Sequence, residues 1–326
     1  MVDAVAWFTR YRSIGCQGNG LASLQHATSI RYFKRALGGS THPKICATPS
    51  LAVRKTTPTM VLTEEQKRSF IRDGYLVLRN VATREMAKDA LRVVDKARAK
   101  GAFTEEDALP DVKREAERAP EIYRMMTDTI LPEACEDLIG KGKIKYGKNA
   151  QIAIRPTEEK FKEKGMTMTE NMPKHKWHID GGKGKYRKTA SPFTLLVGVA
   201  LSEGQDIEEN RGQLNVWPGS HFKLHPLLRE RVQKDLVTDN GQNLFGYGPG
   251  KPDIGQPKRV LLRPGDACIA HQRLGHSGGV NLHADPRIQL YFRVSHKNHD
   301  DCLEQILEGS SVFLEFEGIK ELVGNL

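Results

Sequence analysis

The chain has 326 residues, enough for one large domain or two ordinary ones, and its 38% hydrophobic and 28% charged residues are typical of a globular protein with a sizeable core. No apolar run approaches the ~20 residues that a membrane-spanning helix needs, so no membrane span is predicted. The net charge of +10 is concentrated near the N-terminus, which argues against broad binding to a nucleic-acid backbone.

The first 60 residues form a basic leader that differs from the rest of the chain. They contain eight basic residues and one acid, Asp3, whereas residues 61–326 contain 42 basic and 39 acidic residues. A segment rich in Arg, Ser, Thr and Gly indicates either an organellar transit peptide or a disordered extension, so a mitochondrial and a cytoplasmic location both stay open. We expect residues 61–326 to form the functional domain.

The cysteines give a further indication of the compartment. They are scattered along the chain and odd in number, which favours free thiols in a reducing environment over a disulfide framework. The five are Cys16, Cys46, Cys135, Cys268 and Cys302.

The predicted helices come early in the body of the chain. Thr63 and Gln66 have the spacing of a capping box and Gly74 provides a stop, so residues 64–73 are predicted to be helical. Apolar residues at helical spacing predict further helices over residues 85–99, 120–128 and 131–139.

Short strands dominate the second half. Apolar alternation or short apolar runs between Gly- and Pro-rich turns predict strands over residues 75–79, 150–155, 193–201, 213–217, 259–263, 267–271 and 287–294. Helices followed by many short strands predict an α+β fold. Its core would be a double-stranded β-helix, a cupin-like jelly roll of two sheets, with N-terminal helices at its flank.

The segment WHID carries the first indication of chemistry. His178 and Asp180 are two residues apart, so both side chains leave the same face of an extended segment, while Trp177 and Ile179 point into a packed layer. An imidazole beside a carboxylate makes two thirds of the 2-His-1-carboxylate set that binds non-haem Fe(II). A second His-x-Asp at 283–285 lies in a turn before Pro286, with little chain left to provide a third ligand.

The segment after residue 264 offers the third ligand and a possible anion site. His276 precedes Ser277-Gly278-Gly279, at the expected end of a strand, where it could face a cavity, whereas His271 is expected to pack within its strand or support the site. Arg287 opens the strand RIQLYFRV. A guanidinium directed into an apolar barrel needs an anion, and a carboxylate binds it through two hydrogen bonds, although an exposed position at the strand end is the commoner fate of an arginine.

In these segments the sequence resembles the phytanoyl-CoA dioxygenase (PhyH) family of Fe(II)/2-oxoglutarate-dependent oxygenases. The resemblance covers about residues 62–296. It rests on four segments in order: TEEQKRSFIRDGYLVLRNV, the metal pair in WHID, G-x-L-x-V-x-PGSH from Gly212 to His221, and PGD…H…N…R from Pro264 to Arg287. Two positions depart from the family pattern, because Ile179 replaces a polar residue common between the ligands and the strand TLLVGVALS lacks a common tryptophan.

The resemblance implies a ligand set and a reaction class. His178, Asp180 and His276 would bind Fe(II), and Arg287 would bind the distal carboxylate of 2-oxoglutarate; no further catalytic side chain is implied. O2 would be the second cosubstrate, succinate and CO2 the coproducts, and ascorbate an admissible auxiliary reductant. Asp180 stands where related halogenases have a small residue, so oxygenase chemistry is expected. Hydroxylation of a C–H bond is the default, while desaturation, cyclisation and epimerisation also occur in the family.

The stretch KHKWHIDGGKGKYRK surrounds the metal pair with cations. We expect Lys183, Lys185 and Arg187 to lie at the pocket mouth and to steer an anionic small-molecule substrate such as an acyl-CoA, phosphate or carboxylate, although a solvated loop is the simpler interpretation.

The polar segment 157–174 is either a lid or a surface loop whose methionines fill gaps. A jelly-roll binding protein without catalysis is the alternative function. The sequence predicts no oligomeric state.

Overall fold

A computed structural model describes residues 60–103, 109–181, 192–234 and 251–324. The predicted basic leader lies outside the described residues except for Met60. Lys183, Lys185 and Arg187, the predicted substrate contacts, also lie outside them.

The first helix is fixed by its own sequence. In α1 (Glu64–Asp73) the Thr63 side chain accepts from the Gln66 amide while the Gln66 side chain accepts from the Thr63 amide, so the predicted capping box is confirmed. Gly74 ends the helix at a φ of 79°, where a side chain would also strike His221. The other α-helices are α2 (Arg84–Ala99), α3 (Pro110–Glu117), α4 (Pro120–Thr127), α5 (Leu131–Ile139), α6 (Glu159–Glu163), α7 (Ser220–Gln233), α8 (Leu303–Glu308) and α9 (Lys320–Val323).

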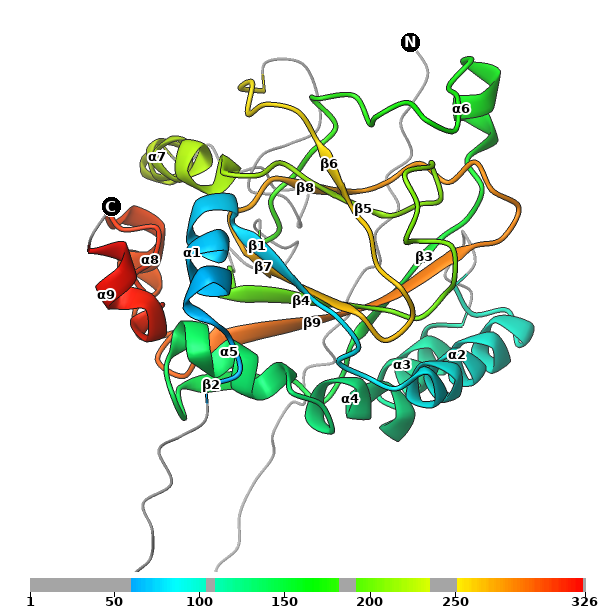
Figure 1. The fold of residues 1–326 in the computed structure, drawn as a ribbon, viewed down its shortest axis with the longest axis horizontal. Coiled ribbons are helices and arrows are strands. Elements are labelled where there is room, and N and C mark those ends of the chain that lie inside the picture. Colours follow the sequence, from blue (N-terminus) through cyan, green and yellow to red (C-terminus); the bar gives the residue numbers. More distant parts are fainter. Residues whose placement is uncertain (1–59, 104–108, 182–191, 235–250, 325–326) are drawn as a thin grey trace, which may run out of the picture. The chain divides into compact units, whose positions relative to one another are not determined.

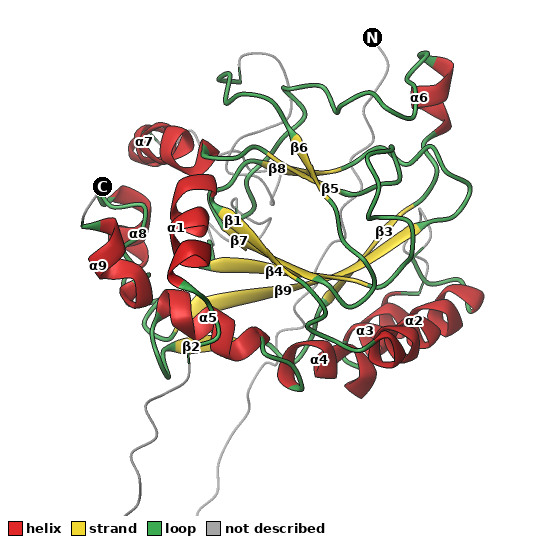
Figure 2. Ribbon diagram, in the orientation of Figure 1, coloured by secondary structure: helices red, strands yellow, loops and turns green. Residues whose placement is uncertain are grey.

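The larger of two sheets is antiparallel and runs in the order β1-β7-β4-β9-β2, with β3 also pairing with β9. Its strands are β1 (Tyr75–Leu78), β2 (Ile144–Tyr146), β3 (Gln151–Arg155), β4 (Leu195–Ala200), β7 (Ala267–His271) and β9 (Arg287–His296). The smaller sheet has the order β6-β5-β8, from β5 (Leu214–Val216), β6 (Lys258–Val260) and β8 (His276–Gly278). The two sheets lie opposite one another, with the helices below and beside them (Figures 1 and 2). The predicted jelly roll with flanking helices is confirmed.

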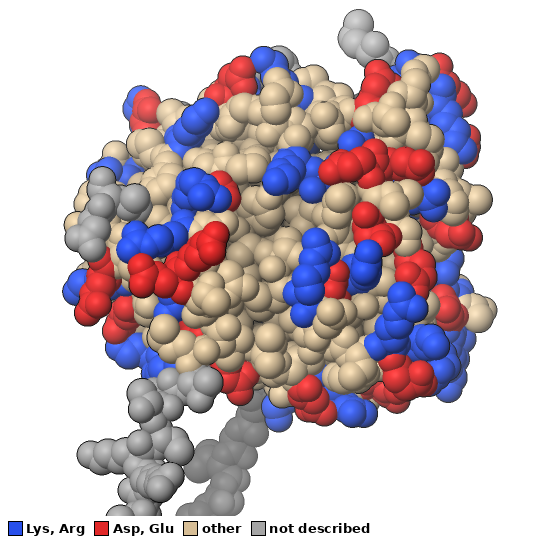
Figure 3. Space-filling model, in the orientation of Figure 1, with Lys and Arg blue, Asp and Glu red and all other residues tan. Residues whose placement is uncertain are grey.

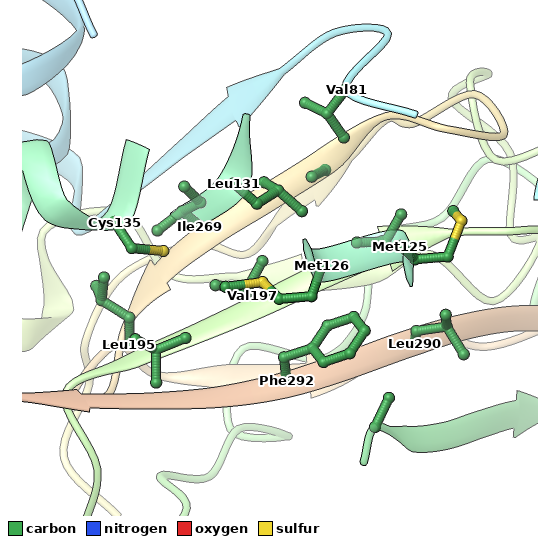
Figure 4. Close-up of a cluster of buried hydrophobic side chains, with 14 of the residues drawn as sticks. Val81, Met125, Met126, Leu131, Cys135, Leu195, Val197, Ile269, Leu290 and Phe292 are labelled. Carbon is green, nitrogen blue, oxygen red and sulfur yellow. The ribbon is translucent and has the colours of Figure 1, made fainter. Parts of the chain in front are cut away.

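Alternation along the strands divides the apolar side chains between two cores. One face of β4 points into the space between the sheets, where Leu196 and Ala200 meet Leu214 and Val216 of β5. The opposite face, with Leu195 and its neighbours, packs on α4 and α5. Figure 4 shows this outer core, in which Met125 and Met126 lie over the strands. The helices therefore cover the back of the large sheet and leave its inner face for the site.

Several elements of the structure differ from the sequence prediction. The helices α3, α6, α7, α8 and α9 and the strand β2 were not predicted. His276 opens a strand, β8, where the sequence placed it at the end of one. Helix α7 contains Pro226 and two buried histidines, so it lacks the apolar stripe that marks a predictable helix. Strand β8 is only three residues long and ends in glycine, so it has no alternating pattern to read.

The methionine segment before WHID packs onto the protein. Met172 is buried among Trp177, Ile179 and Trp217, with Met166 and Met168 packed against the same cluster. The Asn210 side chain donates to the carbonyl oxygens of Thr167 and Glu170 at 2.7 and 2.8 Å. These contacts support the interpretation that the methionines fill gaps.

Two predictions from composition can be compared with the described residues. Within them no helix is long and apolar enough to cross a membrane. Cys135, Cys268 and Cys302 are free thiols, as the scattered cysteines predicted. Burial raises the pKa of the Cys268 thiol to about 12, so this side chain behaves as a small apolar residue between the sheets.

Asp137 fixes the start of the folded body, and its removal should destabilise the protein. Its buried Oδ2 accepts from the amides of Val61 and Leu62 at 2.6 and 2.8 Å, and Oδ1 lies 2.8 Å from Lys141 Nζ. Burial alone would raise the pKa of Asp137, but Lys141 and the two amides outweigh it and lower the pKa. We expect Asp137→Asn to lose about 1–3 kcal/mol at pH 7, measured by urea unfolding, because hydrogen bonds to a charged acceptor weaken to neutral ones.

The stability lost in Asp137→Asn should be largest at neutral pH and should decrease in acid. A carboxyl group with a lowered folded pKa stabilises the protein above its unfolded pKa, and this contribution disappears as the pH falls through the folded value. The difference between wild type and Asp137→Asn should therefore shrink below about pH 4. Asp95→Asn, in an exposed pair with Arg98, is the matched control and should change stability little. An unchanged urea midpoint for Asp137→Asn would contradict the assignment.

Candidate metal centre

The backbone brings together two segments that are far apart in the sequence. His178 and His276 form an antiparallel bridge in which each amide donates to the other's carbonyl oxygen, at 2.9 and 3.0 Å. Directly paired residues project their side chains to the same face, and the two imidazole rings lie 4.4 Å apart between centroids. Trp177 and Ile179 point the other way and are fully buried, as the alternation predicted.

Asp180 completes a three-residue cluster. Its Oδ1 lies 3.4 Å from His178 Nε2 and 3.9 Å from His276 Nε2, and one ligand atom from each of the three residues lies within 4.8 Å of the others. The side chains are 10–15% exposed. Two imidazole nitrogens and one carboxylate oxygen on one side of a shared point form the donor set that suits Fe(II) and leaves other coordination positions open.

The protonation states also suit a metal. Burial, followed by the neighbouring His178 imidazole, lowers the pKa of His276 to about 4, so His276 is neutral at pH 7. Its Nδ1 lies 2.9 Å from the Leu274 carbonyl oxygen and donates to it, which leaves Nε2 as the unprotonated nitrogen facing Asp180. Burial would raise the pKa of Asp180, but the hydrogen bond with His178 and the nearby His276 and Arg293 side chains lower it, so the carboxylate is ionised.

Arg287 opens β9 and lies in the interior. It is 4% exposed, and its Nε donates to the carbonyl oxygen of Gly212. Gly212 has a φ of 78°, and a Cβ there would come within 3.0 Å of the Arg287 side chain. A glycine is therefore required at the first position of the G-x-L-x-V-x-PGSH motif, because only a residue without a side chain lets the backbone approach Arg287 and orient its guanidinium.

Two buried donors in this interior lack acceptors. Among the described residues, Arg287 Nη1 and Gln289 Nε2 have no hydrogen-bond partner. Burial lowers the pKa of Arg287 and the Tyr291 phenol opposes this shift, while the Tyr291 hydroxyl donates to Gln289 Oε1 at 3.2 Å. A buried donor without an acceptor costs about 1–3 kcal/mol. The residues present thus fit an anion such as the distal carboxylate of 2-oxoglutarate, which would accept from these donors.

The other histidines of the sequence argument have structural surroundings. His271 Nε2 lies 3.0 Å from the Val312 carbonyl oxygen and its Nδ1 accepts from the Arg273 amide at 2.9 Å, so both ring nitrogens are engaged away from Asp180. His221 donates through Nε2 to the Ile71 carbonyl oxygen at 3.0 Å. His283 lies 3.5 Å from Asp285, a carboxylate that is 86% exposed, and the pair does not join the cluster.

Three neighbours of the cluster were missed by sequence reasoning. Arg293 Nη2 lies 3.2 Å from Asp180 Oδ2 and 2.9 Å from Gln151 Oε1, and Gln272 Nε2 donates to the Asp180 carbonyl oxygen at 2.7 Å. A signal for Arg293 was present, since it follows Arg287 by six residues and an even spacing places both on one face of a strand. Gln151 lies in β3 and Gln272 in the turn after β7, and neither carried such a signal.

Comparisons with known proteins decide the family. The family model described as phytanoyl-CoA dioxygenase (PhyH) matches residues 70–288, more than half of the chain. The chain belongs to the phytanoyl-CoA dioxygenase family. The protein is therefore an oxygenase that depends on iron and 2-oxoglutarate and uses O2 as a cosubstrate. A search of curated proteins found no match.

Three solved structures resemble the chain at low sequence identity. HygX from Streptomyces hygroscopicus with iron bound is 20% identical, with 72% of this chain and 87% of that chain covered and a TM-score of 0.43. EctD from S. alaskensis in its apoform is 16% identical, covering 74% and 79%, with a TM-score of 0.45. The carbocyclase SnoK of nogalamycin biosynthesis is 16% identical, covering 74% and 90%, with a TM-score of 0.44.

The cluster geometry predicts which histidines bind iron. We expect His178→Ala and His276→Ala each to abolish the visible charge-transfer band of the anaerobic complex with Fe(II) and 2-oxoglutarate, because each removes one of three protein ligands. His271→Ala should retain the band, since both nitrogens of His271 are engaged by backbone groups. His283→Ala, from the second His-x-Asp, is the matched control. Loss of the band in His271→Ala together with its retention in His276→Ala would show the ligand assignment to be wrong.

Proposed function

We propose that the protein oxidises a C–H bond of an anionic small-molecule substrate, with hydroxylation as the outcome and succinate and CO2 as coproducts. In this proposal His178, Asp180 and His276 hold Fe(II), and Arg287 holds the distal carboxylate of 2-oxoglutarate. The observation that carries it is a three-residue metal cluster together with a buried guanidinium nitrogen that has no hydrogen-bond partner among the described residues.

Iron and 2-oxoglutarate would supply the oxidising chemistry. Each protein residue would have a defined task in holding them. His178 and His276 each present a ring nitrogen, and Asp180 presents one anionic oxygen. Arg287 would hold one carboxylate of the cosubstrate through charge-assisted hydrogen bonds. Because Asp180 contributes a carboxylate where halogenases have a small residue, the proposal is oxygenation.

The charges beside the metal segment support an anionic substrate. Lys251 lies over the Trp177 ring, 4.5 Å from its centroid, and donates to the Trp177 carbonyl oxygen. Burial, and then the positive charge of Lys176, lowers the pKa of Lys251 to about 8. Two neighbouring cations of this kind favour an incoming anion. Lys183, Lys185 and Arg187 continue the basic sequence and are proposed as the substrate contacts.

The wider surface does not suggest a polyanion. On the face drawn in Figure 3, basic and acidic side chains intermingle, and many arginines there and elsewhere are paired with nearby acids. The local cations near Trp177 therefore favour a small anionic molecule over a nucleic-acid backbone.

Turnover measurements test the cosubstrate assignment and the proposed function together. We expect Fe(II)-dependent release of succinate, and Arg287→Ala should raise the KM for 2-oxoglutarate about 10- to 100-fold, because a charge-assisted pair is worth about 1.5–3 kcal/mol. Iron binding in the absence of 2-oxoglutarate should stay close to that of wild type. Arg68→Ala, an exposed arginine on α1, is the matched control.

Two outcomes would decide against this proposal. A wild-type protein that binds iron and substrate without releasing succinate would favour the jelly-roll binding protein as the function. An unchanged KM for 2-oxoglutarate in Arg287→Ala would place the carboxylate site elsewhere.

Salt and charge reversal test the substrate class. The KM of an anionic substrate should rise with ionic strength, because the Debye length falls from about 10 Å at 0.1 M salt to about 3 Å at 1 M. Reversal of Lys183, Lys185 and Arg187 to glutamate should raise the same KM and leave iron binding unchanged. The matched control reverses Lys88, Lys96 and Lys100, exposed residues at α2 behind the large sheet. A KM indifferent to both treatments would mean that these cations are a solvated surface.

A further inference from the structure

We propose that Arg293 is a positioning residue for the metal, which holds the outer oxygen of Asp180 so that only the inner oxygen is offered to iron. The inference rests on the proposed function, because it assumes that His178, Asp180 and His276 bind a metal. It concerns a residue with no place in the ligand set or in the binding of 2-oxoglutarate.

The two oxygens of Asp180 have different neighbours. Oδ1 faces the imidazole nitrogens, at 3.4 Å from His178 Nε2 and 3.9 Å from His276 Nε2. Oδ2 lies 3.2 Å from Arg293 Nη2. A guanidinium that holds the second oxygen engages one of its lone pairs and fixes the plane of the carboxylate, which disfavours turning both oxygens to the same metal. Asp180 is thus set to bind through one atom.

Arg293 is itself held in place. Gln151 Oε1 accepts from Arg293 Nη2 at 2.9 Å, and the guanidinium lies over the Phe193 ring, 5.4 Å from its centroid. Strand β9 places Arg293 on the same face as Arg287, since the two are six residues apart in one continuous strand. Contacts from two further segments therefore fix the direction from which the guanidinium approaches Asp180.

The backbone of Asp180 has a separate anchor. Gln272 Nε2 donates to the Asp180 carbonyl oxygen at 2.7 Å, and Gln272 is 3% exposed. With the main chain fixed by Gln272, rotation of the side chain is the remaining freedom of this ligand. Arg293 restricts that rotation.

A role in stability alone is a poor explanation for this arginine. Its side chain is 44% exposed, and half-exposed ion pairs contribute about 0–1 kcal/mol. A cation beside a metal also opposes metal binding by charge repulsion. The contact is best explained by orientation, since partners of metal ligands typically change metal affinity or activity by about 10- to 100-fold when they are removed.

The decisive measurement is the affinity for Ni(II) in the absence of 2-oxoglutarate, by titration calorimetry. Arg293→Gln keeps a hydrogen-bonding side chain but removes the charged fork, and we expect its dissociation constant to rise about tenfold or more. Arg293→Lys keeps the charge and should lie between wild type and Arg293→Gln. Arg68→Gln removes an exposed arginine that pairs with Glu64 at 2.7 Å and is the matched control, with affinity unchanged.

A second readout separates positioning from folding. The melting temperature of metal-free Arg293→Gln should stay within a few degrees of wild type, while the further increase on adding Ni(II) should be smaller. The charge-transfer band of the anaerobic complex with Fe(II) and 2-oxoglutarate should shift or weaken in the same variant.

The outcomes distinguish this inference from the proposed function. If wild type binds Ni(II) and His178→Ala does not, the metal site stands, and an unchanged affinity and band in Arg293→Gln overturn the positioning role alone. If wild type binds no metal, the proposed function and the inference both fail. If metal-free Arg293→Gln melts far below wild type and Arg293→Lys binds Ni(II) as weakly as Arg293→Gln, Arg293 is a structural residue.

Discussion

The site depends on one backbone pairing, the antiparallel bridge between His178 and His276. Register in such a pair is all-or-none, because a slip of one residue turns every side chain to the opposite face. A slip on the first segment would direct Trp177 or Ile179 toward the cluster and put an imidazole among the apolar side chains that now surround them. The free energy of burying two large apolar residues therefore also fixes the direction of the ligands. Packing and ligand geometry are two results of the same alternation.

Strand β9 applies the same rule over a longer distance. Its outward side chains join the core beneath the helices, and they are Ile288, Leu290, Phe292 and Val294. Its inward side chains are polar or aromatic, and they are Arg287, Gln289, Tyr291 and Arg293. Gln289 and Tyr291 also occupy the space beside Gly198, where an added Cβ would lie 2.7 Å from Gln289 Nε2.

A structural feature could be predicted from the sequence when the interaction that determines it joins residues close together in the chain. The capping box at Thr63 and the His-x-Asp spacing act within a few residues, so the helix and the facing of the pair were predicted. The order of motifs indicated the family and the jelly roll. By contrast, β8 exists because three residues of a glycine-rich segment pair with β5, and Arg293 reaches Asp180 across more than a hundred residues. Such contacts depend on the register of distant strands, which a single sequence does not state.

The distribution of charge connects the site with its ligands. Around the cluster, Asp180 is a single carboxylate faced by Arg293, and Arg287 has no acidic partner among the described residues. In the proposed function the dianion 2-oxoglutarate would balance the charge of a divalent metal, so the excess of one positive charge from the arginines would remain. Burial makes this excess more costly, because charges in a low-dielectric interior are poorly screened. A substrate with a negative group would lower that cost, whereas a neutral one would leave it. The same electrostatics that favour 2-oxoglutarate therefore favour an anionic substrate beside it.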